Sequence, residues 1–172
     1  MARAFIAIGS NIKPAENVRA AIQCLARQTR LTGISMVYRT DALEHPEQQP
    51  YYNCVVEIET DVPPAELKHT MLRRIEKGLG RERTEDKYAP RTIDLDLIVY
   101  GDLAMDAQDI KLPDPEILDR AFLAIPLFEL APDLVLPGYG LRIGEIAEKL
   151  PQRGMEPLQD YALLLREKVG RC

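Results

Sequence analysis

Apolar and polar residues alternate along four separate segments of the chain. An alternation with a period of two places every second side chain on the same face of a β-strand. Proline-containing polar loops precede the third and the fourth of these segments. The pattern therefore predicts four strands, at residues 2–11, 33–40, 51–60 and 91–101.

Two further segments carry apolar residues at helical spacing. Residues 14–28 begin with Pro14, and proline suits the first turn of a helix. Residues 63–80 form a second amphipathic pattern that ends near a glycine. The apolar stripes of these two helices are Val18, Ile22 and Leu25 in the first, and Leu67, Met71, Leu72, Ile75 and Leu79 in the second.

The order of these elements is βαββαβ, which is typical of an α+β sandwich of the ferredoxin-like kind, with a largely antiparallel sheet flanked by helices. Beyond the fourth strand, the pattern predicts an extended piece at 110–117 and helices at 118–132 and 142–150. Residues 151–172 are ambiguous, because YALLLREK at 161–168 could be a strand or a helix, and we treat them as a C-terminal extension of unclear role. We expect residues 1–172 to form a single domain.

Composition and charge narrow the class of protein. The chain is 46% hydrophobic and carries a net charge of −5, which does not favour general nucleic-acid binding. Residues 68–91 nevertheless hold eight basic and four acidic residues, and a basic island of this size suits a small polyanion. Cys24, Cys54 and Cys172 lack the spacing of a zinc site or a disulfide framework. We expect a cytoplasmic protein with no membrane partner, because no apolar run suits a signal peptide or a membrane span.

Two aspartates interrupt the fourth strand. Asp94 and Asp96 are two residues apart, so both carboxylates share one strand face, where like charges repel. The arrangement becomes favourable if divalent cations bind, because Mg²⁺ takes one or two carboxylates together with phosphate oxygens. The alternative is a pair of solvated charges on an edge strand. The expected strand faces are Ile93, Leu95, Leu97 and Val99 on one side, and Asp94, Asp96, Ile98 and Tyr100 on the other.

Arginines and aromatic residues stand near this pair. Arg81, Arg83 and Arg91 flank the charged loop before the strand, and guanidinium groups pair with phosphate oxygens. Carboxylates for cations and arginines for the remaining charge suit a metal-bound polyphosphate, although a solvated helix end is the alternative. Tyr51 beside Asn53 suits a flat heterocycle, unless the ring simply packs on the core.

Gly9-Ser10-Asn11 lacks the spacing of a phosphate-binding fingerprint, and a structural turn is the favoured interpretation. His45 and His69 are isolated, and the sequence assigns neither of them a role.

The stretch APRTIDLDLIVYG, residues 89–101, resembles the signature of the 6-hydroxymethyl-7,8-dihydropterin pyrophosphokinase family of folate biosynthesis. In that signature a small residue and Pro-Arg precede Asp-hydrophobic-Asp by two residues. Other blocks match in order, so the resemblance covers roughly residues 2–135. These blocks are residues 4–11, 38–40, 51–60, 75–83 and 119–134.

The resemblance implies an enzyme that transfers pyrophosphate from ATP to the pterin hydroxymethyl group and releases AMP, with two Mg²⁺ ions and as a monomer. The implied catalytic residues are Arg81, Arg91, Asp94 and Asp96, of which the two aspartates hold the metal ions. The implied ATP-binding residues are Glu76, Arg81, Arg83, Tyr88, Arg91, Leu97 and Arg120. The implied pterin-binding residues are Thr40, Leu43, Tyr51, Asn53 and Phe122. Residues 41–50 and 81–90 correspond to loops that close over the substrates.

Two positions depart from the family pattern. Asp114, between Pro113 and Pro115, stands where the family usually has histidine, and Tyr88 stands where it often has tryptophan. A carboxylate repels phosphates unless it faces a metal or an arginine. Two alternatives therefore remain: a paralogue that acts on another pterin or alcohol, and a non-catalytic ligand-binding module. The joint presence of Asp94 and Asp96 with the arginines favours the enzyme over the module.

Overall fold

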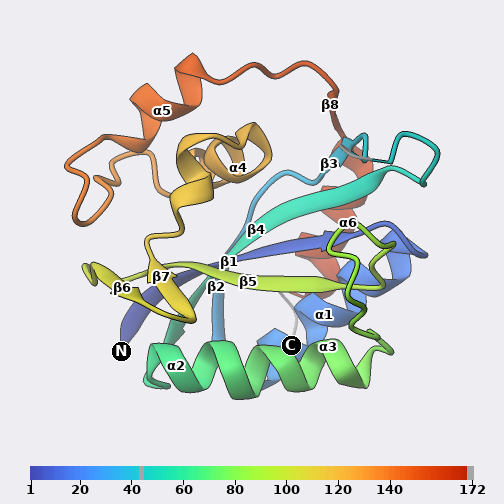
Figure 1. The fold of residues 1–172 in the computed structure, drawn as a ribbon, viewed down its shortest axis with the longest axis horizontal. Coiled ribbons are helices and arrows are strands. Elements are labelled where there is room, and N and C mark those ends of the chain that lie inside the picture. Colours follow the sequence, from blue (N-terminus) through green and yellow to red (C-terminus); the bar gives the residue numbers. More distant parts are fainter. Residues whose placement is uncertain (43–44, 170–172) are drawn as a thin grey trace.

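The computed structural model describes residues 1–42 and 45–169. Its main sheet has six strands in the order β5-β1-β4-β3-β8, and β2 pairs with β4 beside this path (Figure 1). All of its pairs are antiparallel. The strands are β1 (Ala2–Ser10), β2 (Arg30–Ile34), β3 (Tyr38–Thr40), β4 (Tyr51–Thr60), β5 (Asp94–Tyr100) and β8 (Met155–Pro157), with a separate hairpin of β6 (Met105–Ala107) and β7 (Ile110–Leu112).

Helices cover both faces of the sheet. The long helices lie along one face and the shorter helical pair lies on the other, as Figure 1 shows. Within the described residues, no helix combines the length and the apolar character needed to cross a membrane. The face with the long helices carries α1 (Pro14–Gln28) and one continuous helix made of α2 (Pro64–Glu66), the π-helical η1 (Leu67–Leu72) and α3 (Arg73–Gly78). The other helices are the 3₁₀-helix η2 (Pro115–Leu118), α4 (Ala121–Leu130), α5 (Ile143–Lys149) and α6 (Gln159–Val169). The expected ferredoxin-like class is confirmed.

Side chains of β1 alternate between two hydrophobic cores. Ala4, Ile6 and Ile8 pack against the long helices in what we call the first core. Phe5 and Ala7 pack on the other face with α4 and α5, in the second core. A strand that is buried on both faces reads as a nearly continuous apolar run, and "AFIAI" is such a run. The apolar stripes predicted for α1 and for the second helix are buried in, or packed against, the first core.

A β-bulge changes the expected faces of β5. Phe5 pairs with Val99 and Ile6 with Leu97, so Ile98 is an extra residue opposite β1. Val99 consequently packs in the second core, whereas Leu97 packs in the first. The prediction that Val99 shares a face with Leu97 was wrong, because a bulge shifts the alternation beyond it. The two aspartates precede the bulge, so their shared face is unaffected.

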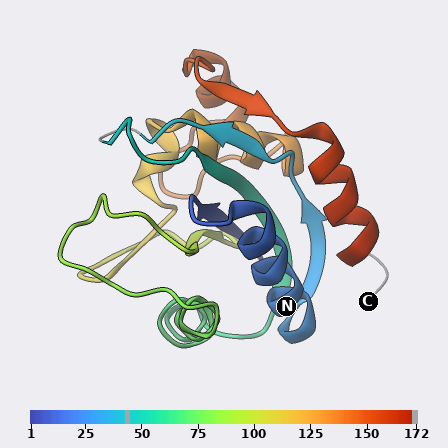
Figure 2. The same ribbon diagram turned by 90° about the vertical axis from the view of Figure 1, so that its right-hand side faces the viewer.

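The segment predicted as one strand at 33–40 forms two strands instead. The backbone N–H of Ser35 donates to Val55 at 3.0 Å, but the Ser35 hydroxyl accepts the N–H of Val55 at 2.9 Å. The N–H of Met36 then donates to the Glu129 carboxylate of α4 at 2.8 Å, so the backbone leaves the sheet ladder at this residue. The ambiguous tail contains both a strand, β8, and a helix, α6, which Figure 2 shows at one side of the sheet.

We predict that Ile6→Ala lowers the free energy of unfolding by about 2–5 kcal/mol, because Ile6 is fully buried and the neighbouring strands cannot close the cavity. Urea unfolding followed by circular dichroism measures the change. The control is Leu163→Ala on α6, where the side chain is 55% exposed, and its expected effect is within about 0.5 kcal/mol. Equal effects of the two variants would contradict the described core.

Candidate active site

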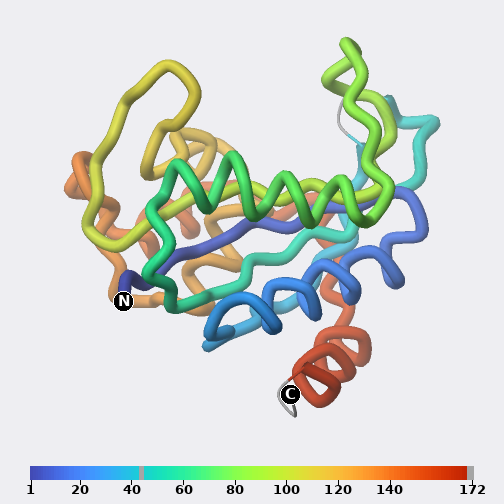
Figure 3. The backbone as a smooth tube through the Cα atoms, turned by 90° about the horizontal axis from the view of Figure 1, so that it is seen from below, coloured from blue at the N-terminus to red at the C-terminus, as the bar shows by residue number. Residues whose placement is uncertain are grey.

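A cavity of about 200 Å³ opens on the sheet face that carries α4. Residues 41–42 and 45–50 and the loop from residue 81 to 90 contribute to its wall. Figures 1 and 3 both show residues 45–50 beside the loop 81–90 at one end of the sheet. Of the residues implicated by sequence, those that line the cavity are Thr40, Tyr51, Asn53, Tyr88, Arg91, Asp94, Asp96 and Phe122.

Strand pairing brings the polar residues of the cavity together. Gly9 of β1 pairs with Asn53 of β4 on one side and with Asp94 of β5 on the other. A Cβ atom on Gly9 would lie 2.8 Å from Asn53 Oδ1, which is closer than real Cβ contacts allow. Glycine at this position therefore leaves room for the Asn53 carboxamide beside the aspartate.

The Asn53 end of the cavity is suited to a flat, polar ring. Asn53 Nδ2 donates to Thr40 Oγ1 at 2.7 Å, which orients the carboxamide. Tyr51 contributes an aromatic ring from β4, and Phe122 contributes another from α4. Aromatic faces and an edge of donors and acceptors are what a planar heterocycle needs.

Two arginines neutralise Asp94. Arg81 Nη1 donates to Asp94 Oδ1, and Arg91 Nη1 donates to Asp94 Oδ2 at 2.5 Å. Arg81 Nη1 also lies 3.1 Å from Glu76 Oε1 and 3.2 Å from the carbonyl oxygen of Ile93. Both oxygens of Asp94 thus have cationic partners.

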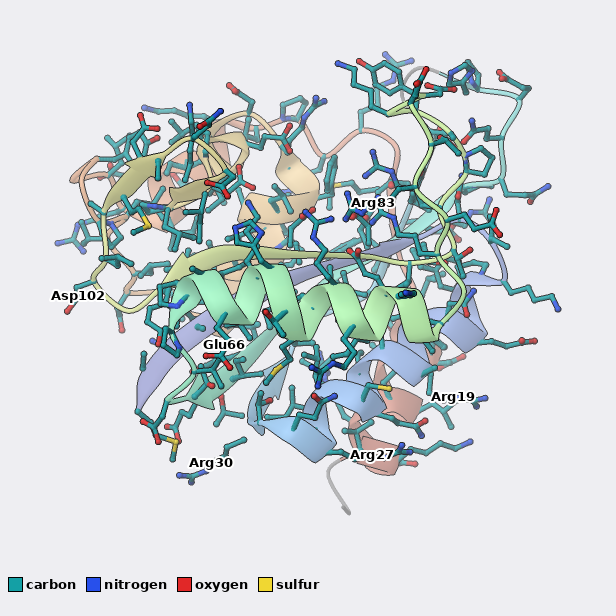
Figure 4. The ribbon with its side chains drawn as sticks, turned by 60° about the horizontal axis from the view of Figure 1, so that its bottom comes forward. Arg19, Arg27, Arg30, Glu66, Arg83 and Asp102 are labelled. Carbon is teal, nitrogen blue, oxygen red and sulfur yellow. The ribbon has the colours of Figure 1, made fainter. Side chains whose placement is uncertain are left out.

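Glu76 is a buried carboxylate that binds Arg81 and a further arginine, Arg83. Its oxygens accept from the backbone N–H of Leu95 at 2.9 Å and from Arg83 Nη2 at 3.0 Å, in addition to Arg81. Burial raises the pKa of Glu76, while Leu95 N–H and Arg81 act in the opposite direction. Figure 4 shows Arg83 on one side of the long helix, with Arg19, Arg27 and Arg30 on the other.

Five of the implicated residues do not line the cavity: Glu76, Arg81, Arg83, Leu97 and Arg120. Glu76, Arg81 and Arg83 form the ionic cluster behind Asp94. Leu97 is buried in the first core. Leu43 lies outside the described residues.

Asp96 differs from its neighbour, because no hydrogen bond or ion pair to its carboxylate occurs within residues 1–42 and 45–169. The side chain is exposed on the cavity side. Partial desolvation of the carboxyl group and the charges of Asp94 and Asp114 raise its pKa above the ordinary value, while Arg91 acts in the opposite direction. A carboxylate without a cationic partner of its own suits a hard divalent cation.

Metal binding here would need more than protein ligands. The described part of the chain holds no group of three or more His, Cys, Asp or Glu side chains arranged to hold a metal ion. Mg²⁺ commonly keeps only one or two carboxylates and completes its shell with phosphate oxygens and water. The pair of aspartates therefore fits cations that arrive with a phosphate ligand.

Asp114 lies in the wall of the same cavity. Its side chain accepts from the N–H of Glu116 at 2.9 Å and caps η2, while its own N–H donates to Ile98 at 2.8 Å. Burial raises the pKa of Asp114. The residue thus has a structural role as a helix cap and also adds negative charge near Asp96.

Asn11 connects the two loops, a role that the sequence did not reveal. It is 3% exposed; its Oδ1 accepts the N–H of Arg91 at 2.7 Å, and its Nδ2 donates to Gln48 Oε1 at 3.1 Å. Gln48 Nε2 in turn donates to the carbonyl of Tyr88 at 2.9 Å, and the His45 ring lies 6.1 Å from the Tyr88 ring. The only sequence signal was the position of Asn11 at the end of a strand, because its partners are 37 and 80 residues away.

Comparisons with known proteins show which family the chain resembles. The family model described as 7,8-dihydro-6-hydroxymethylpterin-pyrophosphokinase matches residues 5–132. A 2-amino-4-hydroxy-6-hydroxymethyldihydropteridine pyrophosphokinase of Pseudomonas aeruginosa is 36% identical over 91% of this chain and 96% of the relative. The protein of the same name from Haemophilus influenzae is 37% identical over 80% of this chain and 86% of the relative.

Solved structures show the same fold. A crystal structure of Plasmodium falciparum HPPK-DHPS superposes with a TM-score of 0.68 over 86% of this chain. The sequence identity is 12%, and this chain spans 43% of that structure's chain. At this identity the likeness concerns the fold alone.

We predict that Glu76→Ala lowers the free energy of unfolding by about 3–5 kcal/mol, because it leaves the N–H of Leu95 and two arginines without their buried acceptor. Thermal and urea unfolding measure the change. Glu82→Ala is the control, since Glu82 is exposed and its loss should change stability by no more than about 0.5 kcal/mol. A stability loss below about 1 kcal/mol for Glu76→Ala would show that the cluster does not depend on this carboxylate.

Proposed function

The chain belongs to the 7,8-dihydro-6-hydroxymethylpterin-pyrophosphokinase family and is a pyrophosphokinase of folate biosynthesis, and we propose that its reaction takes place in the cavity beside Gly9. In this reaction, pyrophosphate passes from ATP to 6-hydroxymethyl-7,8-dihydropterin and AMP leaves. One observation carries the proposal: Gly9 pairs with Asn53 on one side and with Asp94 on the other. The part of the cavity suited to a flat ring would therefore lie next to the paired carboxylates.

The acceptor end of the cavity would hold the pterin. Tyr51 and Phe122 would each cover a ring face, while Asn53 and Thr40 would bind its edge. Fixing the hydroxymethyl oxygen next to the phosphates removes much of the entropic barrier to reaction. In the transfer, this oxygen forms a bond to the β-phosphorus of ATP as the bond from that phosphorus to the AMP oxygen breaks. The hydroxyl proton goes to water.

The charged end would hold the triphosphate. Arg81 and Arg91, which pair with Asp94 in this structure, would exchange that carboxylate for phosphate oxygens. Asp94 and Asp96 would hold two Mg²⁺ ions, which when bound neutralise phosphate charge and favour the leaving of AMP. The linked loops, joined through Gln48 and Tyr88, would exclude water from the reacting groups.

The remaining implied features are also part of the proposal. They comprise contacts to ATP from Glu76, Arg83, Tyr88, Leu97 and Arg120, a contact to the pterin from Leu43, and a cytoplasmic, monomeric enzyme. Of these residues, Tyr88 lines the cavity. Arg83 lies at the base of the loop that carries Tyr88. Closure of this loop over ATP would bring the two side chains nearer to the nucleotide.

A second candidate is a related enzyme with a different acceptor alcohol, and the observation that favours it is Asp114 in the cavity wall. Its carboxylate adds to the negative charge around Asp96 at a position where the family usually has histidine. The two candidates differ in the acceptor, and they share the ATP chemistry.

We predict that AMP forms from ATP and Mg²⁺ only when 6-hydroxymethyl-7,8-dihydropterin is present. Asp96→Ala should slow this reaction at least about 10²-fold, because it removes a carboxylate that would hold the metal. AMP is quantified by chromatography at saturating substrates. Asp102→Ala is the control: Asp102 is an exposed carboxylate near β5, labelled in Figure 4, and its loss should leave the rate unchanged. ATP cleavage with another alcohol, and none with this pterin, would select the second candidate.

We further predict that Asp114→Asn lowers the KM for ATP several-fold, about 1 kcal/mol, because it removes a negative charge near the phosphates and keeps a residue that caps η2. Steady-state kinetics at fixed Mg²⁺ measure this, and Asp102→Asn, an exposed position outside the cavity lining, serves as the charge-matched control. A higher KM for ATP in Asp114→Asn would show that the carboxylate assists cation binding.

A further inference from the structure

The C-terminal segment that contains β8 and α6 lies beyond the residues matched by the family model, which end at 132. It nevertheless completes the main sheet. β8 pairs with β3, with Arg39 opposite Glu156 and Thr40 opposite Met155. Figure 2 shows β8 running beside β3 along the edge of the sheet.

The strand β3 has little else to hold it. It is three residues long, and on its other side Thr40 pairs with Tyr51 and Tyr38 with Asn53 of β4. Its first residue is tied to α4 by a hydrogen bond from the Tyr38 hydroxyl to Glu129. Such a short strand depends on both neighbours for its position, because each ladder provides only a few hydrogen bonds.

Helix α6 anchors β8 to the body of the protein. The Tyr161 hydroxyl donates to the carbonyl of Ala15 at 2.6 Å, and Arg166 Nε donates to the carbonyl of Ile34 at 3.0 Å. Between them, Ala162 and Leu165 are buried in the first core. Figure 3 shows α6 close to α1. The tail is therefore a fixed part of the fold that carries β8 with it.

Through β3, the C-terminal segment is connected to the end of the cavity that contains Asn53, the proposed acceptor end. Thr40, held between β8 and β4, accepts the hydrogen bond that orients Asn53. The turn before β8 also lies near the wall, since a Cβ added at Gly154 would be 3.9 Å from Asp41 Oδ2. Asp41 lines the cavity next to Thr40, whereas no residue of the segment contacts Asp94 or its arginines through a hydrogen bond or ion pair described above.

We propose that residues 151–169 position β3, and through Thr40 and Asn53 set the affinity for the pterin acceptor without affecting the nucleotide end of the cavity. The inference rests on the proposed function, because it assigns Asn53 to the acceptor. A segment that only shields the sheet edge from other chains would instead alter stability and leave both substrate affinities unchanged.

The test compares two changes at one position of β8. Glu156→Pro removes a backbone donor from the edge strand, whereas Glu156→Ala removes only the exposed carboxylate that lies 3.4 Å from Arg39. In AMP-release assays, Glu156→Pro should raise the KM for the pterin about tenfold and change the KM for ATP less than twofold. Glu156→Ala should leave both within about twofold. Equal shifts in both KM values, or no shift in a folded Glu156→Pro protein, would overturn the inference.

A measurement on the unmodified protein covers the case in which Glu156→Pro does not fold. Amide hydrogen exchange of residues 38–40 and 155–158 should slow when the pterin binds in the presence of a non-hydrolysable ATP analogue, relative to the analogue alone. Unchanged exchange in both segments would overturn the inference. If the unmodified protein forms no AMP with this pterin, the proposed function fails, and that outcome is distinct from a failure of the tail's role.

Discussion

The double ion pair of Asp94 with Arg81 and Arg91 is the interaction on which the site depends. Two carboxylates on one strand face repel each other, and β5 tolerates them because one is neutralised by arginines while the other faces the cavity. Glu76 also binds Arg81, so this guanidinium keeps one carboxylate partner if Asp94 releases it. The same groups that make the ligand-free protein stable are then available to a polyphosphate that brings its own cations.

The architecture explains why the two ends of the cavity are adjacent. β1 lies between β4, which carries Tyr51 and Asn53, and β5, which carries the two carboxylates. Gly9 at the end of β1 has no side chain, so Asn53 and Asp94 can line one cavity across it. Asn11, two residues later, joins the loops above them. Residues 9–11, at the end of the first strand, thus lie between the two ends of the cavity and connect its loops.

Local pattern was sufficient to predict most of the fold and part of the site. The alternation of β4 and the apolar stripe of α1 can be read from adjacent positions in the sequence. The spacing of Asp94 and Asp96 likewise predicts that both side chains lie on one face of β5. The bulge at Ile98 could not be predicted, because it depends on the register with β1. Nor could the role of Asn11, whose partners are distant in sequence. The tail was ambiguous because β8 is formed only by pairing with β3.

We propose that Asp94 exchanges its arginines for cations when ATP binds. A crystal structure with Mn²⁺ and a non-hydrolysable ATP analogue would show this exchange, since the anomalous signal of Mn²⁺ locates the metal. We expect Mn²⁺ on Asp94 and Asp96, with Arg81 and Arg91 turned to phosphate oxygens. Mn²⁺ bound elsewhere, with both arginines still on Asp94, would rule the exchange out.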